Sequence, residues 1–152
     1  MEFLIKENIP SISANVKKED FTCRLICLHP QPPAPDEVIN TKNRDRELLV
    51  VANRVAEQKG LTIVLGDLND VAWSDTSYKF RLISGLKDPR KGRGFYNTYH
   101  ARIPFLRWAL DHVFISKEFK LIRIERLPSI GSDHFPISFI LVSINSLLCS
   151  AL

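Results

Sequence analysis

Hydrophobic and polar positions along the chain follow two spacings, one typical of a helix and one typical of strands. Over residues 43–58, apolar side chains recur every three or four positions, and Gly60 follows as a residue that commonly ends a helix. Shorter apolar runs of strand length, bounded by polar turns, stand on both sides of this segment. They predict strands over residues 9–16, 21–28, 61–65, 96–100, 110–116, 121–127 and 137–142, and a short second helix is expected over 77–84.

The order of these elements indicates the fold class. A strand, a helix and a strand come first, and consecutive strands follow, which predicts a mixed β-sheet flanked by helices in the α/β (α+β) class. The continuous apolar run over residues 61–65 is typical of a strand that is covered on both faces. Because the sequence contains no repeat or linker, we expect one domain over residues 1–142 and an apolar tail over 143–152.

Composition and charge limit the class of protein without selecting a function. The chain has 152 residues, of which 45% are hydrophobic and 25% charged, a balance that excludes wholesale disorder. Its net charge of +4 suits an anionic partner but does not require one. The first residues are charged too early for a secretory signal. Pro136 and polar residues interrupt the apolar stretch over 135–152, so a buried strand and a tail are expected there rather than a membrane span.

The three cysteines predict no disulfide. Cys23 and Cys27 lie four residues apart on an expected strand, where their Cα atoms would be about 13 Å apart, too far for a bridge. Cys149 lies in the tail. A zinc site at Cys27 and His29 would need further ligands that the surrounding sequence does not supply. We therefore expect reduced thiols and a cytoplasmic or cytosol-facing protein.

Two short runs carry groups that are suited to catalysis. In Gly-Asp-Leu-Asn-Asp, Asp67 and Asn69 stand two positions apart at the end of an expected strand, so both side chains leave the same face. In Gly-Ser-Asp-His-Phe-Pro-Ile, Asp133 and His134 precede the last expected strand. Metal-assisted phosphoester hydrolysis uses such carboxylates, amides and imidazoles. Asp and Asn also favour plain strand-ending turns, an alternative that the second run makes weaker.

The two runs resemble the late motifs of the endonuclease/exonuclease/phosphatase superfamily, the deoxyribonuclease I-like enzymes. Those motifs read roughly Gly-Asp-x-Asn and Ser-Asp-His-x-Pro, and here they stand in the family's order, separated by a third family element at residues 110–115. The resemblance extends over residues 23–142 and covers the later half of the family's domain. It implies half of a four-layer α/β/β/α sandwich, with one sheet expected from each half. It also implies hydrolysis of a phosphoester bond by water with Mg²⁺ or Mn²⁺.

The resemblance further implies roles for five catalytic positions. Asp67 would orient the attacking water, and Asn69 and His29 would contact the phosphate. His134 would act as general base or general acid. Asp111 would support it by holding its other ring nitrogen, which sets the tautomer.

Other polar residues near the motifs receive different expectations. Asp133 is implied as the carboxylate that binds the metal. His112 would point away from Asp111 on a strand and receives no role, and Asp70 is expected to serve only the turn. A serine hydrolase based on Ser132 is set aside, because residues adjacent in sequence cannot easily reach one another as nucleophile, base and orienting group.

The loop before residue 95 is basic. Arg90, Lys91 and Arg93 are candidates for contacts with substrate phosphates, although a solvated charged loop is the more common structure for such a sequence. Aromatic residues between 95 and 108 are expected to pack in the core or at its rim rather than to stack on bases.

The family also requires an Asn and a metal-binding Glu from the first half of its domain, and no residue of this sequence stands in a matching context. Glu2, Glu7 and Glu19 do not follow a convincing buried strand. We therefore expect the chain to correspond to the later half. Its apolar sheet face would then be covered by a second copy of the chain or by an amino-terminal half. Two functions stay open: a phosphoester hydrolase, and a catalytically incomplete domain that serves phosphate binding or assembly.

Substrate and location follow only from the resemblance. Enzymes acting on DNA, RNA, phosphoinositides and sphingomyelin share these motifs, so the expected partner is a phosphoester, with nucleic acid and a phospholipid headgroup as options. The His-Pro-Gln-Pro-Pro run over residues 29–33 is most similar to bacterial, often membrane-tethered members. It implies membrane association through an amino-terminal segment as an alternative to the cytoplasm.

Overall fold

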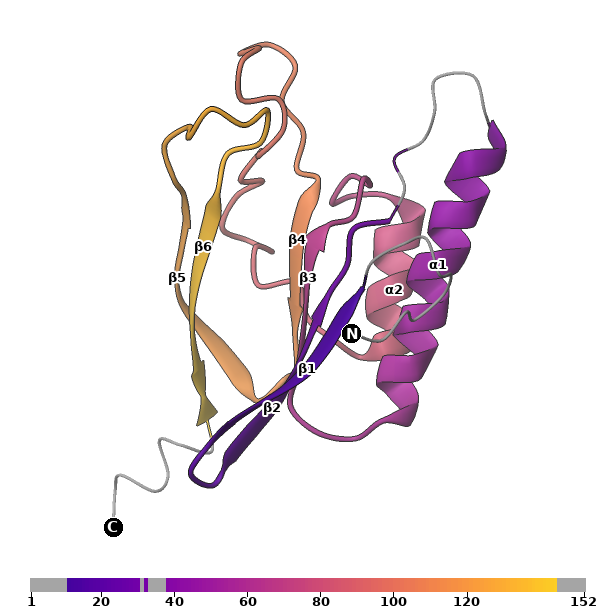
Figure 1. Cartoon of the computed structure of the whole chain (residues 1–152), viewed down its shortest axis with the longest axis vertical. Helices are drawn as coiled ribbons and strands as arrows, with labels where there is room; N and C mark the ends of the chain where they lie inside the picture. Colours follow the sequence, from indigo (N-terminus) through magenta and orange to yellow (C-terminus); the bar gives the residue numbers. More distant parts are fainter. Residues whose placement is uncertain (1–10, 31, 33–37, 145–152) are drawn as a thin grey trace.

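The computed structural model of the chain describes residues 11–30, 32 and 38–144. Within these residues, two helices and two β-sheets form the fold, and the helices lie side by side on one face of the larger sheet (Figure 1). In chain order the elements are β1 Ile12–Lys18, β2 Phe21–Cys27, α1 Val38–Glu57, β3 Thr62–Asp67, α2 Asp75–Ser84, β4 Asp111–Ile115, β5 Phe119–Arg126 and β6 Ile137–Ser143.

The topology of the larger sheet brings separate strand ends together. Its strand order is β1-β2-β3-β4, in which β2 and β3 are parallel and the other pairs are antiparallel. Helix α1 makes the crossover that a parallel pair requires. The carboxyl ends of β2 and β3 therefore share one edge of the sheet, and the antiparallel β4 begins at that edge, where Asp111 pairs with Asp67.

The helices cover one face of this sheet with a hydrophobic core. Helix α1 buries the apolar positions that the sequence predicts, Leu48, Val51, Ala52 and Val55. Helix α2 contributes Phe80, whose ring lies 4.6 Å from that of Phe114 on β4. Burial of these side chains stabilises the helices on the sheet, because transfer of apolar surface out of water is favourable.

The other face of the sheet packs against the two-stranded sheet β5–β6. Val113 and Ile115 of β4 form a buried cluster there with Cys23 and Phe119, and Phe139 of β6 packs against it. The expected fold class is thus confirmed, but the prediction that the chain supplies a single sheet is wrong. Apolar side chains on both faces of β3 and β4 need cover on both sides, and the chain itself covers part of the second face.

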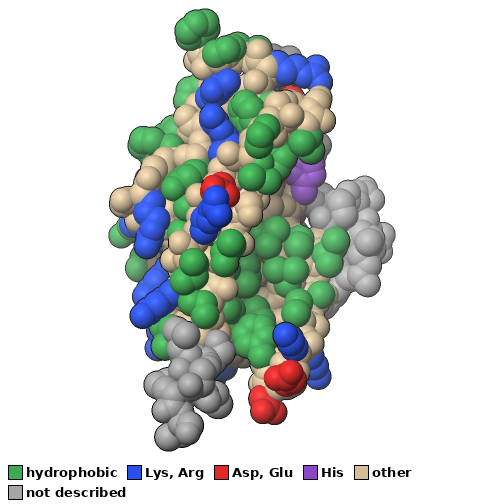
Figure 2. Space-filling model, turned by 90° about the vertical axis from the view of Figure 1, so that its left-hand side faces the viewer, with side chains coloured by type: hydrophobic (Ala, Val, Ile, Leu, Met, Phe, Trp, Pro, Cys, Tyr) green, Lys and Arg blue, Asp and Glu red, His purple; other side chains and the backbone are tan. Residues whose placement is uncertain are grey.

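The β5–β6 side of the molecule keeps hydrophobic side chains at its surface. Figure 2 looks onto this side and shows them gathered mainly below its middle. Ile122 and Ile140 on these strands are at least half exposed. That another chain or segment covers this surface stays a prediction.

One predicted strand is absent from the structure. Residues 96–100 form no strand, and Tyr99 makes only isolated bridges, to Trp108 and to His134. The left-handed backbone of Tyr96 (φ 50°) interrupts the extended conformation that a strand needs. Residues 145–152 of the expected tail lie outside the described part of the chain.

Cys23 and Cys27 are free thiols, as the spacing predicts. Burial raises the pKa of both thiols, so they remain protonated at neutral pH. No helix in the described residues is long and apolar enough to cross a membrane.

Candidate active site

An open cleft of about 870 Å³ lies at the edge of the larger sheet where β2 and β3 end and β4 begins. Every side chain that the family motifs imply lines this cleft, namely His29, Asp67, Asn69, Asp111, Asp133 and His134. Tyr99 and Trp108 complete part of its wall. The sheet topology therefore brings together residues that are more than a hundred positions apart in the sequence.

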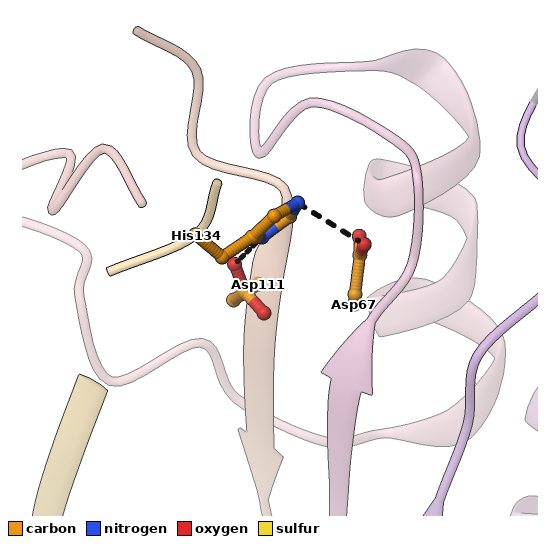
Figure 3. Close-up of side chains that lie close together, drawn as sticks. All are labelled: Asp67, Asp111 and His134. Atoms are coloured by element: carbon orange, nitrogen blue, oxygen red, sulfur yellow. Dashed lines mark hydrogen bonds and ion pairs between the residues drawn. The ribbon is translucent and has the colours of Figure 1, made fainter. Parts of the chain in front are cut away.

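His134 is held by a carboxylate. Its Nδ1 lies 2.7 Å from Oδ2 of Asp111, the first residue of β4. A carboxylate can only accept this hydrogen bond, so Nδ1 carries the proton and Nε2 faces the other way. Nε2 lies 3.6 Å from Oδ2 of Asp67 across the cleft (Figure 3). The imidazole thus presents its free nitrogen to the same space as a second carboxylate.

Asp67, the last residue of β3, is the centre of this arrangement. Its Oδ1 accepts a hydrogen bond from the backbone N–H of Asn69 at 2.9 Å. Its Oδ2 lies between two imidazoles, 3.6 Å from His134 and 3.7 Å from Nε2 of His29. Burial raises the pKa of Asp67, and the negative charge of Asp111 acts in the same direction, while the Asn69 N–H opposes both.

Close backbone packing sets the position of His29 and Asn69. Gly66 has φ +143°, and a Cβ at this position would stand 1.9 Å from the carbonyl oxygen of Leu28, so only glycine fits. The side-chain amide of Asn69 donates to the carbonyl of Pro30 at 2.9 Å. The loops after β2 and β3 are therefore joined, although the His29 side chain stays largely exposed.

The cleft offers a donor set for a divalent cation. Asp67, Asp111 and His134 can place one ligand atom each within 4.8 Å of one another. Carboxylate oxygens are the protein ligands that Mg²⁺ prefers, and Mn²⁺ accepts them as well. A cation between the two carboxylates would also relieve the repulsion that raises the pKa of Asp67. The residues present therefore fit such an ion.

Asp133, the implied metal ligand, is not part of that group of three. Its carboxylate is fully exposed at the rim, and its backbone carbonyl accepts a hydrogen bond from Ala101 at 2.7 Å. The carboxylates in that group are those of Asp67 and Asp111.

The prediction that the basic loop contacts phosphate is wrong for Arg90. Its side chain is 3% exposed and pairs with Asp88 at 2.8 Å. It also donates to the backbone carbonyl of Asp111 at 2.9 Å, so it is not available to a substrate. Burial alone would raise the pKa of Asp88, but the hydrogen bonds and charge of Arg90 outweigh it and lower that pKa. Lys91 and Arg93 are exposed, and they line a second pocket rather than the cleft.

Sequence reasoning missed a buried polar network behind the cleft. Nε2 of His112 lies 2.8 Å from the carbonyl of Asp70, and its Nδ1 lies 3.0 Å from Nη2 of Arg90. Arg44 donates to the carbonyl of Asn69 at 2.6 Å and pairs with the Asp70 carboxylate at 3.3 Å. Asp70 is 4% exposed and therefore does more than form a turn.

This network holds the backbone of two cleft residues, Asn69 and Asp111, from the helix side. One signal in the sequence could have revealed it. His112 alternates with Asp111 on β4 and so belongs to the face that the helices bury, where a polar side chain needs partners.

Solved structures share the fold of this chain at low sequence identity. A crystal structure of TDP2 from D. rerio, complexed with a single-strand DNA product, superposes with a TM-score of 0.71 at 17% identity, covering 88% of this chain and 61% of that one. An endonuclease/exonuclease/phosphatase from Bacteroides vulgatus gives 0.69 at 20% identity, with 88% and 55% covered. A mannosyl-6-phosphatase from Bacteroides thetaiotaomicron gives 0.60 at 21% identity, with 80% and 51% covered.

The chain thus spans little more than half the length of these similar proteins. Among curated proteins, no sequence matches it. The model of the Endonuclease/Exonuclease/phosphatase family matches residues 2–134, which include both motif runs up to His134. On this match and on the shared fold, the chain belongs to the endonuclease/exonuclease/phosphatase family.

Proposed function

We propose that this chain carries the acid–base residues of a metal-dependent phosphoester hydrolase that uses water as its nucleophile. The observation that carries the proposal is the Asp111–His134 pair, whose free imidazole nitrogen faces Asp67 across an open cleft. A histidine in this setting can take a proton from water, because the carboxylate behind it stabilises the imidazolium that forms.

The residues divide the reaction between them. Asp67 Oδ2 and His134 Nε2 are close enough to bind one water molecule together. The water oxygen bonds to phosphorus and the ester P–O bond breaks. The water proton passes to Nε2 of His134, and the leaving oxygen takes a proton from solvent in the open cleft. His134 then returns its proton to solvent.

His29 and Asn69 suit the substrate phosphate. The exposed ring of His29 stands beside Asp67, where an N–H can donate to a phosphoryl oxygen. The amide of Asn69 has a second N–H beyond the one that Pro30 accepts. A neutral amide can bind a phosphoryl oxygen without adding negative charge near it.

A divalent cation completes this proposal. The carboxylates of Asp67 and Asp111 would hold it, and when bound it would neutralise charge that develops on the phosphoryl group. The similar proteins include a phosphatase and a protein with a DNA product, which supports phosphoesters as the substrate class.

A second candidate function follows from the length of the chain. It spans 51–61% of the three similar structures, and the described residues bring only two carboxylates into the cluster. On this alternative, the chain is a catalytically incomplete domain that binds phosphate or assembles with a second copy or another segment.

Hydrolysis of bis(p-nitrophenyl) phosphate with Mg²⁺, with Mn²⁺ and with EDTA tests the proposal. We expect metal-dependent release of nitrophenol, reduced about 10²- to 10⁴-fold in His134→Ala. His100→Ala is the matched control, because His100 lies outside the cleft lining and should leave the rate unchanged.

Equal rates of nitrophenol release by wild type and His134→Ala would contradict the hydrolase proposal. An inactive wild type that still binds inorganic phosphate, with binding lost in His134→Ala, would favour the incomplete domain.

A further inference from the structure

Three exposed aromatic side chains form a continuous surface that leads away from the cleft. Trp108 lines the cleft, and its ring lies 6.5 Å from that of Trp73. The Trp73 ring lies 5.4 Å from that of Phe95. The exposed fractions of Trp73, Phe95 and Trp108 are 54%, 65% and 43%, so none of the three is a core residue. Such a concentration of exposed rings is unusual unless it binds something.

The far end of this surface is a pocket of about 400 Å³, which we call the aromatic–basic pocket. Its walls include Trp73, Phe95, Lys91 and Arg93. Lys91 and Arg93 are exposed, and neither is paired with a carboxylate among the ion pairs of the described residues. Their charge therefore attracts an anion to a place where flat rings are also exposed.

The pocket is built on a rigid base that is tied to the cleft. Asp88 and Arg90 line it and form the buried ion pair beneath it. Arg90 also donates to the carbonyl of Asp111, the residue that holds His134. Arg93 donates to the carbonyl of Pro89 at 2.9 Å, which holds the loop in place. The pocket is therefore preformed relative to the candidate active site.

We propose that the aromatic–basic pocket, with Trp108 as its link to the cleft, binds the part of a single-stranded nucleic acid that extends from the phosphate in the active site. Bases stack on exposed aromatic rings whatever their sequence, while lysine and arginine contact the phosphates between them. A lipid headgroup would satisfy the two cations but offers no flat base to stack on the three rings. This inference rests on the proposed function, since it extends the substrate of the same site.

Binding of a fluorescein-labelled hexathymidylate, followed by anisotropy in EDTA, tests the pocket without any hydrolysis. We expect Trp73→Ala to weaken binding about tenfold to a hundredfold, and Trp73→Tyr to retain most of it, because a tyrosine ring still stacks. Lys91→Gln with Arg93→Gln should reduce the slope of log affinity against log salt by about 1.4, that is about 0.7 for each lost phosphate contact.

Tyr78→Ala is the matched control. Tyr78 is 57% exposed and lies beside Arg81, so it is also an exposed aromatic ring near an arginine, but it lies outside the pocket. Its removal should leave hexathymidylate binding unchanged. Equal affinity of wild type and Trp73→Ala would overturn the proposal. So would binding to phosphatidylserine vesicles that depends on Trp73 when hexathymidylate does not bind.

Failure of this inference can be separated from failure of the hydrolase. If bis(p-nitrophenyl) phosphate hydrolysis depends on His134 but hexathymidylate binding does not depend on Trp73, only the pocket assignment is wrong. If Trp73-dependent binding is present but wild type does not hydrolyse bis(p-nitrophenyl) phosphate, the pocket assignment stands and the hydrolase proposal is wrong.

Discussion

His112 of β4 points to one face of the strand, whereas His134 bonds to Asp111 on the other face, and their surroundings differ. His112 faces the helices, is 2% exposed, and is bound on both ring nitrogens by Arg90 and the carbonyl of Asp70. His134 is bound on one nitrogen only, by Asp111, and its other nitrogen faces an open cleft. The first histidine holds structure in place, and the second leaves one ring nitrogen open to the cleft.

The two regions also differ in how far their charges are neutralised by neighbouring charges. Behind β4, Arg90 and Asp88 neutralise each other away from water. In the cleft, Asp67 and Asp111 are like charges that are only partly screened, and burial and repulsion together raise the pKa of Asp67. A buried network that is complete stabilises the fold, whereas a site with uncompensated charge is suited to binding a cation or a proton.

Removal of Arg90 should have the largest effect on stability. Arg90→Gln leaves the Asp88 carboxylate buried without its cation and removes the donor to the Asp111 carbonyl. We expect a loss of about 3–5 kcal/mol in the free energy of unfolding. Urea denaturation followed by circular dichroism measures it, with Arg93→Gln as the exposed control, expected within about 0.5 kcal/mol of wild type. A loss below 1 kcal/mol for Arg90→Gln would show that the network does not hold the fold.

A smaller effect concerns the pH dependence of stability. Burial, followed by the charge of Arg90, lowers the pKa of His112 from its ordinary 6.5 to about 4. The unfolded chain therefore binds this proton between pH 6.5 and about 4 while the folded chain does not. As far as His112 is concerned, the free energy of unfolding is therefore highest above pH 6.5. It falls as the pH falls toward 4, by up to about 3 kcal/mol.

His112→Asn isolates this contribution, because asparagine does not titrate. We expect the variant to be less stable than wild type at pH 7 but to show a flatter loss between pH 6.5 and 4. Parallel pH profiles for the two proteins, from urea denaturation at each pH, would mean that His112 does not provide the dependence.

Much of the cleft could be predicted from the sequence, because the two motif runs stand at strand ends and resemble the motifs of a known family. That resemblance indicated that Asp67 and Asp111 belong to one site, and the sheet topology explains how they meet. The basic loop could not be predicted in the same way. Arg90 and Lys91 are neighbours in one polar segment, yet the first is buried and the second is exposed, and only the folded path of the loop decides between them.

The number of sheets also could not be predicted from the sequence. Strand patterns indicated which segments are extended but not that β5 and β6 pair separately and cover the second face of β3 and β4. His112 shows the same limit on a smaller scale. Its type and position on the strand were clear, but its partners come from the turn after β3 and the loop after α2.

A double-mutant cycle on kcat for bis(p-nitrophenyl) phosphate tests most directly whether Asp111 and His134 act as one catalytic unit. Asp111→Asn should lower kcat on the order of 10³- to 10⁴-fold, because an amide can hold the imidazole in the wrong tautomer. Combined with His134→Ala at saturating Mg²⁺, it should cost far less than the roughly 10³- to 10⁴-fold that Asp111→Asn costs alone. Losses that multiply in the double variant would show that the two residues act independently and would contradict the catalytic pair.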